Sequence, residues 1–124
     1  MNFGTLDDSR WPMAVVHLEA APKDMADFER YLGEIDVLYE RKERFVFVFD
    51  ARKVGWLEFP YLIRQAQHMI DNEANTIEWI SKTAIVAPHP ITQGLLRMLF
   101  LLRTPSCPTQ VFSGYDEALE WVQT

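Results

Sequence analysis

The stretch that most constrains the fold is Phe45–Phe49, a run of five aromatic or β-branched residues. A strand that faces water on one side alternates apolar and polar residues, whereas this run has no polar break. It therefore predicts a strand that is covered on both faces, inside a sheet flanked by helices. Asp50 and Arg52 follow directly, so this strand brings two charged side chains to its carboxyl end, where ligands usually bind in open α/β sheets.

Apolar patterns and turn signals predict the other elements. Strands are expected at Phe3–Leu6, Trp11–Glu19, Thr83–Ala87 and Gln110–Phe112, with a turn at Asp7–Arg10. Helices are expected from Pro22 to Tyr39, from Phe59 to about Trp79, from Ile91 to Arg103, and after a Ser113 cap with Asp116 at the capping-box position. This alternation predicts one α/β domain over residues 1–124, with a mostly parallel sheet of four or five strands flanked by helices.

The second of these helices has a pronounced apolar side. This apolar side comprises Leu62, Ile63, Ala66, Met69, Ile70 and Ile77. The third helix, Ile91–Arg103, is apolar nearly all round, although a surface helix needs only one apolar stripe. Its second apolar face has three explanations: burial beneath the last strand and helix, a dimer seam, or the wall of an apolar pocket.

Composition excludes several classes of function. A net charge of -6 argues against nucleic acid or anionic lipid as a partner. The lone Cys107 excludes an intramolecular disulfide and a Cys-based zinc site, and the three His residues show no metal-ligand spacing. Neither a glycine-rich phosphate loop nor a Gly-x-Ser-x-Gly elbow is present. We therefore expect no metal, no cofactor and no enzymatic activity.

The expected compartment is the cytoplasm. The N-terminal residues show no basic stretch followed by an apolar one, as a signal peptide would. The most apolar segment, Gly94–Leu102, contains Arg97 and is about half as long as a membrane span must be. No transmembrane segment is therefore expected.

Charged and polar residues at the predicted carboxyl ends of strands are candidates for a site. Asp50 and Arg52 either orient a polar ligand or partner, or serve the structure, with Asp50 capping the loop or pairing with a nearby Arg or Lys. His89 lies between two prolines before a helix, where it either meets an anion together with free helix amides or is a plain turn histidine. Right-handed crossovers place the Asp50 and His89 loops on one rim of the sheet.

Several segments together resemble bacterial proteins of the STAS/SEC14-like group, also described as SpoIIAA-like. The matching segments are Glu43–Arg52, Arg64–Ala66, Pro88–Arg97, and Val111–Phe112 with Glu117–Trp121. The resemblance implies a small α/β domain with a four- or five-stranded sheet, in a family whose members mostly have no established activity. Anti-sigma-factor antagonists of the STAS type carry a phosphorylatable Ser after the central strand. Here the corresponding segment Val54–Pro60 contains neither Ser nor Thr, which argues against that switch.

The leading hypothesis is a non-enzymatic STAS-like interaction module, either a homodimer or a subunit of a regulatory complex. The rival hypothesis is a carrier or sensor that binds a small apolar ligand or lipid in a SEC14-like pocket. The residues expected to bind the partner or ligand are Asp50, Arg52, Trp56, His89, Arg97 and Phe100.

Overall fold

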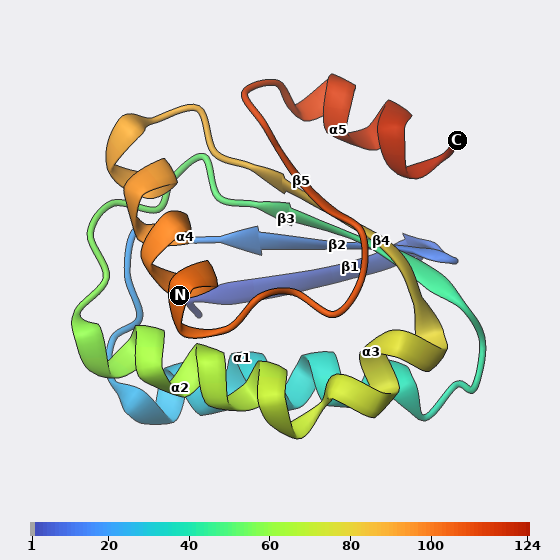
Figure 1. Cartoon of the computed structure of the whole chain (residues 1–124), viewed down its shortest axis with the longest axis horizontal. Helices are drawn as coiled ribbons and strands as arrows, with labels where there is room; N and C mark the ends of the chain where they lie inside the picture. The colour runs from blue at the N-terminus through green and yellow to red at the C-terminus, as the bar shows by residue number, and fades with distance from the viewer. Residues whose placement is uncertain (1) are drawn as a thin grey trace.

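A computed structural model of the chain describes residues 2–124 and contains a five-stranded sheet in the order β1-β2-β3-β4-β5. The strands are β1 Gly4–Arg10, β2 Met13–Leu18, β3 Phe45–Asp50, β4 Ile80–Val86 and β5 Thr109–Phe112. The first pair is antiparallel and every later pair is parallel, as Figure 1 shows. The sheet is therefore mixed and mostly parallel, which confirms the predicted fold class.

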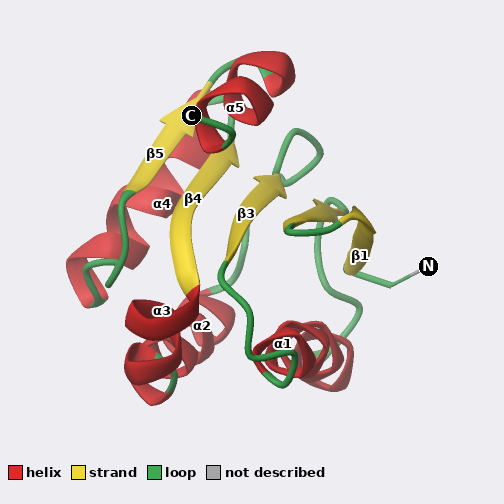
Figure 2. Ribbon diagram, turned by 90° about the vertical axis from the view of Figure 1, so that its right-hand side faces the viewer, coloured by secondary structure: helices red, strands yellow, loops and turns green. Residues whose placement is uncertain are grey.

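Four helices cover one face of this sheet and one helix covers the other (Figure 2). The helices are α1 Met25–Tyr39, α2 Phe59–Asp71, α3 Glu73–Trp79, α4 Pro90–Leu102 and α5 Tyr115–Val122. Helix α5 packs on β3 and β4 from the opposite side to α1 and α2. Among residues 2–124, no helix combines the length and the apolar character that a membrane crossing requires.

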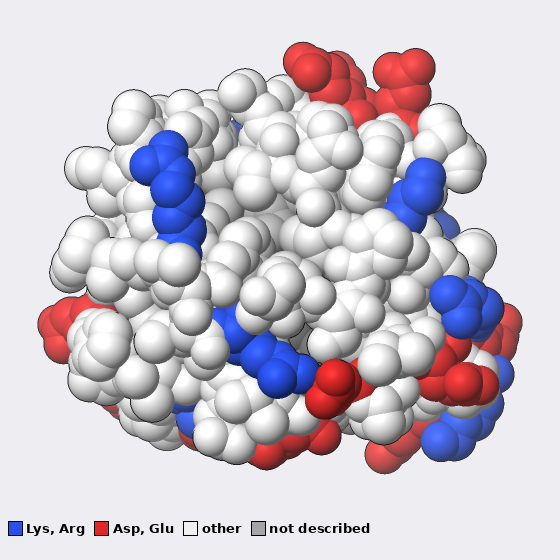
Figure 3. Space-filling view, viewed as in Figure 1, with Lys and Arg blue, Asp and Glu red and all other residues white. Residues whose placement is uncertain are grey.

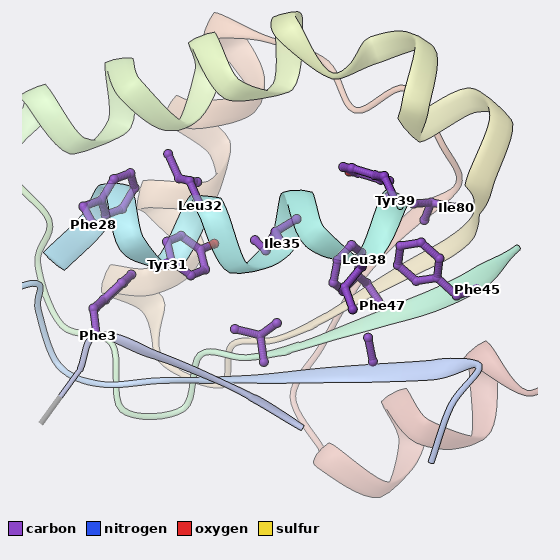
Figure 4. Close-up of a cluster of buried hydrophobic side chains, with 12 residues drawn as sticks. Phe3, Phe28, Tyr31, Leu32, Ile35, Leu38, Tyr39, Phe45, Phe47 and Ile80 are labelled. Atoms are coloured by element: carbon purple, nitrogen blue, oxygen red, sulfur yellow. The ribbon is translucent and has the colours of Figure 1, made fainter. Parts of the chain in front are cut away.

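The central strand β3 is buried on both faces, as its sequence predicts. Phe45 and Phe47 point toward α1 and join the larger core, which Figure 4 shows. Val48 points the other way and packs with Ala84 and Ala118 beneath α5. The alternation of side chains along a strand thus divides one apolar run between two cores.

The opening hairpin differs from the prediction. Asp7–Arg10 was expected to be the turn, but these residues belong to β1, and the chain turns at Trp11 and Pro12. The polar residues do form a local turn inside the strand: the Asp7 carboxylate accepts from the Ser9 amide at 3.0 Å and from its hydroxyl. The pairing with β2 is irregular between Asp7 and Arg10. The turn signal therefore marks a kink in β1 and not its end.

Three helix boundaries also differ. The first helix begins at Met25, not at Pro22, because the Asp24 side chain accepts from the Asp27 amide at 2.8 Å and caps the helix. The expected helix to Trp79 is interrupted at Asn72, whose side chain donates to the His68 carbonyl at 3.1 Å and competes with regular helix hydrogen bonds.

The last helix was expected to be capped by Ser113, and this prediction is wrong. Gly114 is the N-cap of α5, with no side-chain hydrogen bond. Glu117, three residues after Gly114, lies close to it and takes the place that was assigned to Asp116. The helix start is therefore shifted by one residue from the predicted capping box.

Candidate functional site

Asp50 lies at the carboxyl end of β3 within a compact polar cluster. Its Oδ1 accepts from Nε of Arg52 at 2.8 Å and from the Arg52 backbone amide at 3.2 Å. Its Oδ2 accepts from a second guanidinium nitrogen of Arg52 at 2.8 Å and from Nδ1 of His17 at 2.9 Å. The Arg52 guanidinium in turn lies over the Tyr115 ring, 4.6 Å from its centroid.

This geometry favours the structural explanation of the Asp50–Arg52 pair. The carboxylate is buried and already accepts four hydrogen bonds within the chain, so little acceptor capacity is left for a ligand. The Arg52 side chain, which donates two of these bonds, is the main cause of a pKa for Asp50 well below its ordinary value. The cluster joins β2, β3 and α5 at one edge of the sheet.

We expect Asp50→Asn to destabilise the protein by on the order of 1–3 kcal/mol at pH 7, since it removes charge from a buried hydrogen-bond acceptor. The pKa of Asp50 is lower in the folded chain than its ordinary value of 3.8, so the folded state binds fewer protons. The Asp50 carboxylate therefore stabilises the folded state fully above about pH 4, and this stabilisation is lost as the pH falls further. Urea titrations of the wild-type protein and the variant between pH 7 and pH 3 measure the difference in their free energies of unfolding. This difference should shrink as the pH falls.

Asp8→Asn is the matched control for this prediction. Asp8 pairs with Arg41 on the surface, where an ion pair contributes roughly 0–1 kcal/mol. Equal losses of stability in the two variants, or a difference for Asp50→Asn that grows toward pH 3, would contradict the prediction.

The other predicted site residues lie apart from this cluster. Trp56 is exposed in the loop between β3 and α2, and His89 is exposed at the start of α4, where its side chain forms no capping hydrogen bond. Arg97 is exposed on α4, whereas Phe100 is half-buried against Ala87 and its neighbours. The Asp50 and His89 loops do leave the same edge of the sheet, because β3 and β4 are parallel neighbours. Within residues 2–124, no three His, Cys, Asp or Glu side chains converge on a point that would hold a metal.

A cavity of about 190 Å³ lies between the sheet and the helices α1, α2 and α4. Phe47 and Phe49 of β3 line it from the sheet, Tyr31 from α1, and Leu96 and Phe100 from α4. The pocket-wall explanation for the second apolar face of α4 therefore applies to Leu96 and Phe100.

A second feature is an exposed apolar surface on α2 and α4, which we call the α2–α4 face. The two helices pack together through Leu62 and Ala66 of α2 and through Leu95 and Leu99 of α4. Large apolar side chains that border this contact remain exposed: Phe59, Ile63, Ile70, Ile91, Met98, Leu101 and Leu102. Figure 3 shows that uncharged side chains cover much of this side of the molecule, with a basic side chain over α4 and charged groups of both signs beside α2.

The α2–α4 face corrects the expectation for the second helix. Ile63 and Ile70, which belong to the apolar side inferred from the sequence, are 46% and 45% exposed, and Ile77 of α3 is exposed as well. Leu101 of α4 is 87% exposed, so burial within the fold does not account for the whole of that helix.

Neither a protein-family model nor a curated protein matches the sequence. Among solved structures, a DUF3478-family protein of uncharacterised function with a SpoIIAA-like fold, from Shewanella loihica, matches with a TM-score of 0.65 and 11% identity, over 96% of this chain and 91% of that chain. This chain has a SpoIIAA-like fold. An anti-sigma factor antagonist from Mycobacterium paratuberculosis matches with a TM-score of 0.63 and 16% identity, over 98% of this chain and 93% of that chain. The resemblance inferred from the sequence is thus confirmed for the fold.

In this SpoIIAA-like chain, the segment between β3 and α2 is held as a structural loop. The Val54 carbonyl accepts from the Thr92 hydroxyl of α4 at 2.8 Å, and the Gly55 amide donates to the Ala20 carbonyl at 3.2 Å. Val54 itself is buried against Ala87 and Phe100. The segment Val54–Pro60 has no hydroxyl side chain that a kinase would phosphorylate.

Sequence reasoning missed His17 as a partner of Asp50. His17 lies inside the expected strand Trp11–Glu19 and was not among the candidate site residues, yet the parallel pairing of β2 and β3 places it directly beside Asp50. The sequence did carry a signal for this pairing, because His17 and Asp50 each follow an apolar run within a predicted strand. The SpoIIAA-like strand order then makes these two strand ends neighbours.

Proposed function

We propose that this protein is a non-enzymatic cytoplasmic interaction module that forms a homodimer through the α2–α4 face. The observation that carries the proposal is the set of seven exposed large apolar side chains on the two helices, among them Leu101 at 87% and Ile91 at 61% exposure. Apolar patches of this kind on a folded protein typically mark interaction sites. The anti-sigma factor antagonist with the same fold has a name that implies a protein partner, which agrees with an interaction role.

Charge favours a second copy of the chain as the occupant. The chain has a net charge of -6, so most surfaces of two copies repel each other. The α2–α4 face lacks that penalty because its core is apolar. At its border, Arg103 is neutralised by Glu73 of α3 at 3.0 Å. The apolar core of the face can pack against its own copy across the two-fold axis of a homodimer, with the exposed Arg97 of α4 beside it.

We expect light scattering coupled to size-exclusion chromatography at high micromolar concentration to give about twice the monomer mass of 14.5 kDa. Leu101→Glu should weaken the dimer by about 100-fold or more, because a two-fold axis brings two carboxylates into an apolar interface and each 1.4 kcal/mol is a factor of ten. The variant should therefore elute as a monomer with an unchanged circular dichroism spectrum.

Val37→Glu is the matched control, since Val37 is an exposed apolar residue of α1 outside the α2–α4 face. It should leave the dimer mass unchanged. A monomeric wild-type protein, or equal dissociation by both variants, would show that this face does not hold two copies together.

A further inference from the structure

The cavity between the sheet and the helices is enclosed by segments that are far apart in the sequence. The connection from α4 to β5 passes across it, and Pro105, Ser106 and Cys107 of this connection line the cavity (Figure 1). The surface over this region is largely uncharged and hollowed near the middle of the face in Figure 3. A volume of about 190 Å³ is larger than a cavity of roughly 150 Å³ that is known to hold benzene.

The wall of the cavity is mainly apolar, with many aromatic rings, and carries no fixed charge. Eight aromatic side chains line it: Phe3, Phe28, Tyr31, Tyr39, Phe47, Phe49, Tyr61 and Phe100. Among the described residues that line it, there is no Lys, Arg, Asp or Glu. His68, the one lining residue with a basic side chain, is paired through Nε2 with Asp36 at 2.7 Å. A charged ligand would find no counter-ion here and would pay a large desolvation cost.

Neutral polar groups interrupt the apolar wall at several places, and two of them offer hydrogen-bonding groups that are close together. The Tyr31 hydroxyl donates to Oε1 of Gln65 at 3.3 Å, and burial raises the pKa of Tyr31 so that the phenol stays protonated. Within residues 2–124, the Gln65 side chain has no other hydrogen bond, so one end of its amide is free for a ligand. At the second place, the hydroxyl of Thr83 and the thiol of Cys107 are 3.3 Å apart.

We propose that this cavity binds a compact, uncharged ring compound of about ten non-hydrogen atoms that bears one hydroxyl or carbonyl group. The rings of the wall offer edge and face contacts to a flat ligand, and the Gln65 amide pairs with its polar group. Long acyl chains exceed the volume, and carboxylates or phosphates lack a partner. The cavity and the proposed dimer face use different side chains of α4, because the half-buried Leu96 lines the cavity whereas Leu101 is exposed.

Isothermal titration with 2-naphthol and 2-naphthoate tests the ligand class, because the two probes share a ring system and differ in charge at pH 7. We expect 2-naphthol to bind with a dissociation constant on the order of 1–100 μM, and 2-naphthoate to bind at least about 100-fold more weakly. Failure of 2-naphthol to bind, or equal binding of 2-naphthoate, would overturn the proposal.

Two variants place the probe in the cavity. Leu96→Trp adds a ring inside the cavity and should reduce 2-naphthol affinity at least tenfold, whereas Val37→Trp adds the same ring to the exposed side of α1, away from the cavity and the α2–α4 face, and should change nothing. Gln65→Leu, which keeps the side-chain volume, should weaken 2-naphthol binding about tenfold and leave naphthalene binding unchanged. If Leu96→Trp does not fold, the Gln65→Leu result decides: equal losses for 2-naphthol and naphthalene, or no loss for either, would refute the assigned contact.

Discussion

Val48→Asp is expected to remove a large part of the stability of the folded state at pH 7. Val48 is fully buried in the middle of β3, between Val15 of β2 and Ala84 of β4, and is covered by α5. The buried residues that form this core are all apolar. The pKa of a fully buried carboxyl is raised by up to roughly 3–5 units, and each unit corresponds to about 1.4 kcal/mol, so the loss is about 4–7 kcal/mol. A chain of this size has roughly 5–15 kcal/mol of stability in total.

The pH dependence of this variant gives an independent check. Because the new carboxyl would have a higher pKa in the folded than in the unfolded state, the folded state binds more protons, and the destabilisation should shrink as pH falls toward about 4. Circular dichroism during urea titration at pH 7 and pH 4.5 measures this change. The control Val111→Asp places the same charge on the exposed side of the edge strand β5 and should cost less than about 1 kcal/mol. A Val48→Asp protein as stable as wild type would show that α5 does not seal this face.

The parts of the fold that follow from local patterns were predictable from the sequence. The unbroken apolar run of β3 correctly indicated cover on both faces, and the alternation of strands and helices correctly indicated a mostly parallel sheet. Boundaries set by single side-chain hydrogen bonds were not predictable. Asn72 ends α2 because its amide bonds to the His68 carbonyl, and nothing in a helical apolar pattern reports that bond.

The apolar stripe of α2 shows a second limit. Periodicity identified Leu62, Ile63, Ala66 and Ile70 as one apolar side, but α4 covers only the part around Leu62 and Ala66. The periodic pattern shows which residues are apolar, but it does not show how much of that apolar side a neighbouring helix will cover. The exposed remainder appears only when α2 and α4 are placed together.

The candidate site was partly predictable for a similar reason. Asp50 and Arg52 are two residues apart, so their pairing was among the possibilities that the sequence allowed. His17 joins them only through the register of β2 on β3. The cavity depends on the spacing between layers and on the path of the connection after α4, neither of which a pattern of residue types encodes.

Phe45→Ala is expected to lower the free energy of unfolding by about 3–5 kcal/mol. Phe45 is 1% exposed, and its ring centroid lies 5.0 Å from those of Trp11 and Phe47 and 6.1 Å from that of Tyr39. The side chain thus joins the β1–β2 hairpin and α1 to the central strand. Phe45 does not line the 190 Å³ cavity, so the substitution creates a new void within a packed cluster. Urea titration followed by far-ultraviolet circular dichroism measures the loss.

Phe59→Ala is the matched control, because Phe59 is 53% exposed at the start of α2 and the same atoms are removed. Its cost should stay below about 1 kcal/mol. The Phe45 variant should also lose near-ultraviolet circular dichroism from Trp11, since the ring against which this indole packs is gone, whereas the Phe59 variant should keep it. Equal costs for the two substitutions would mean that the aromatic cluster around β3 does not hold the hairpin to the sheet. In that case, the structural role assigned here to the run Phe45–Phe49 would be wrong.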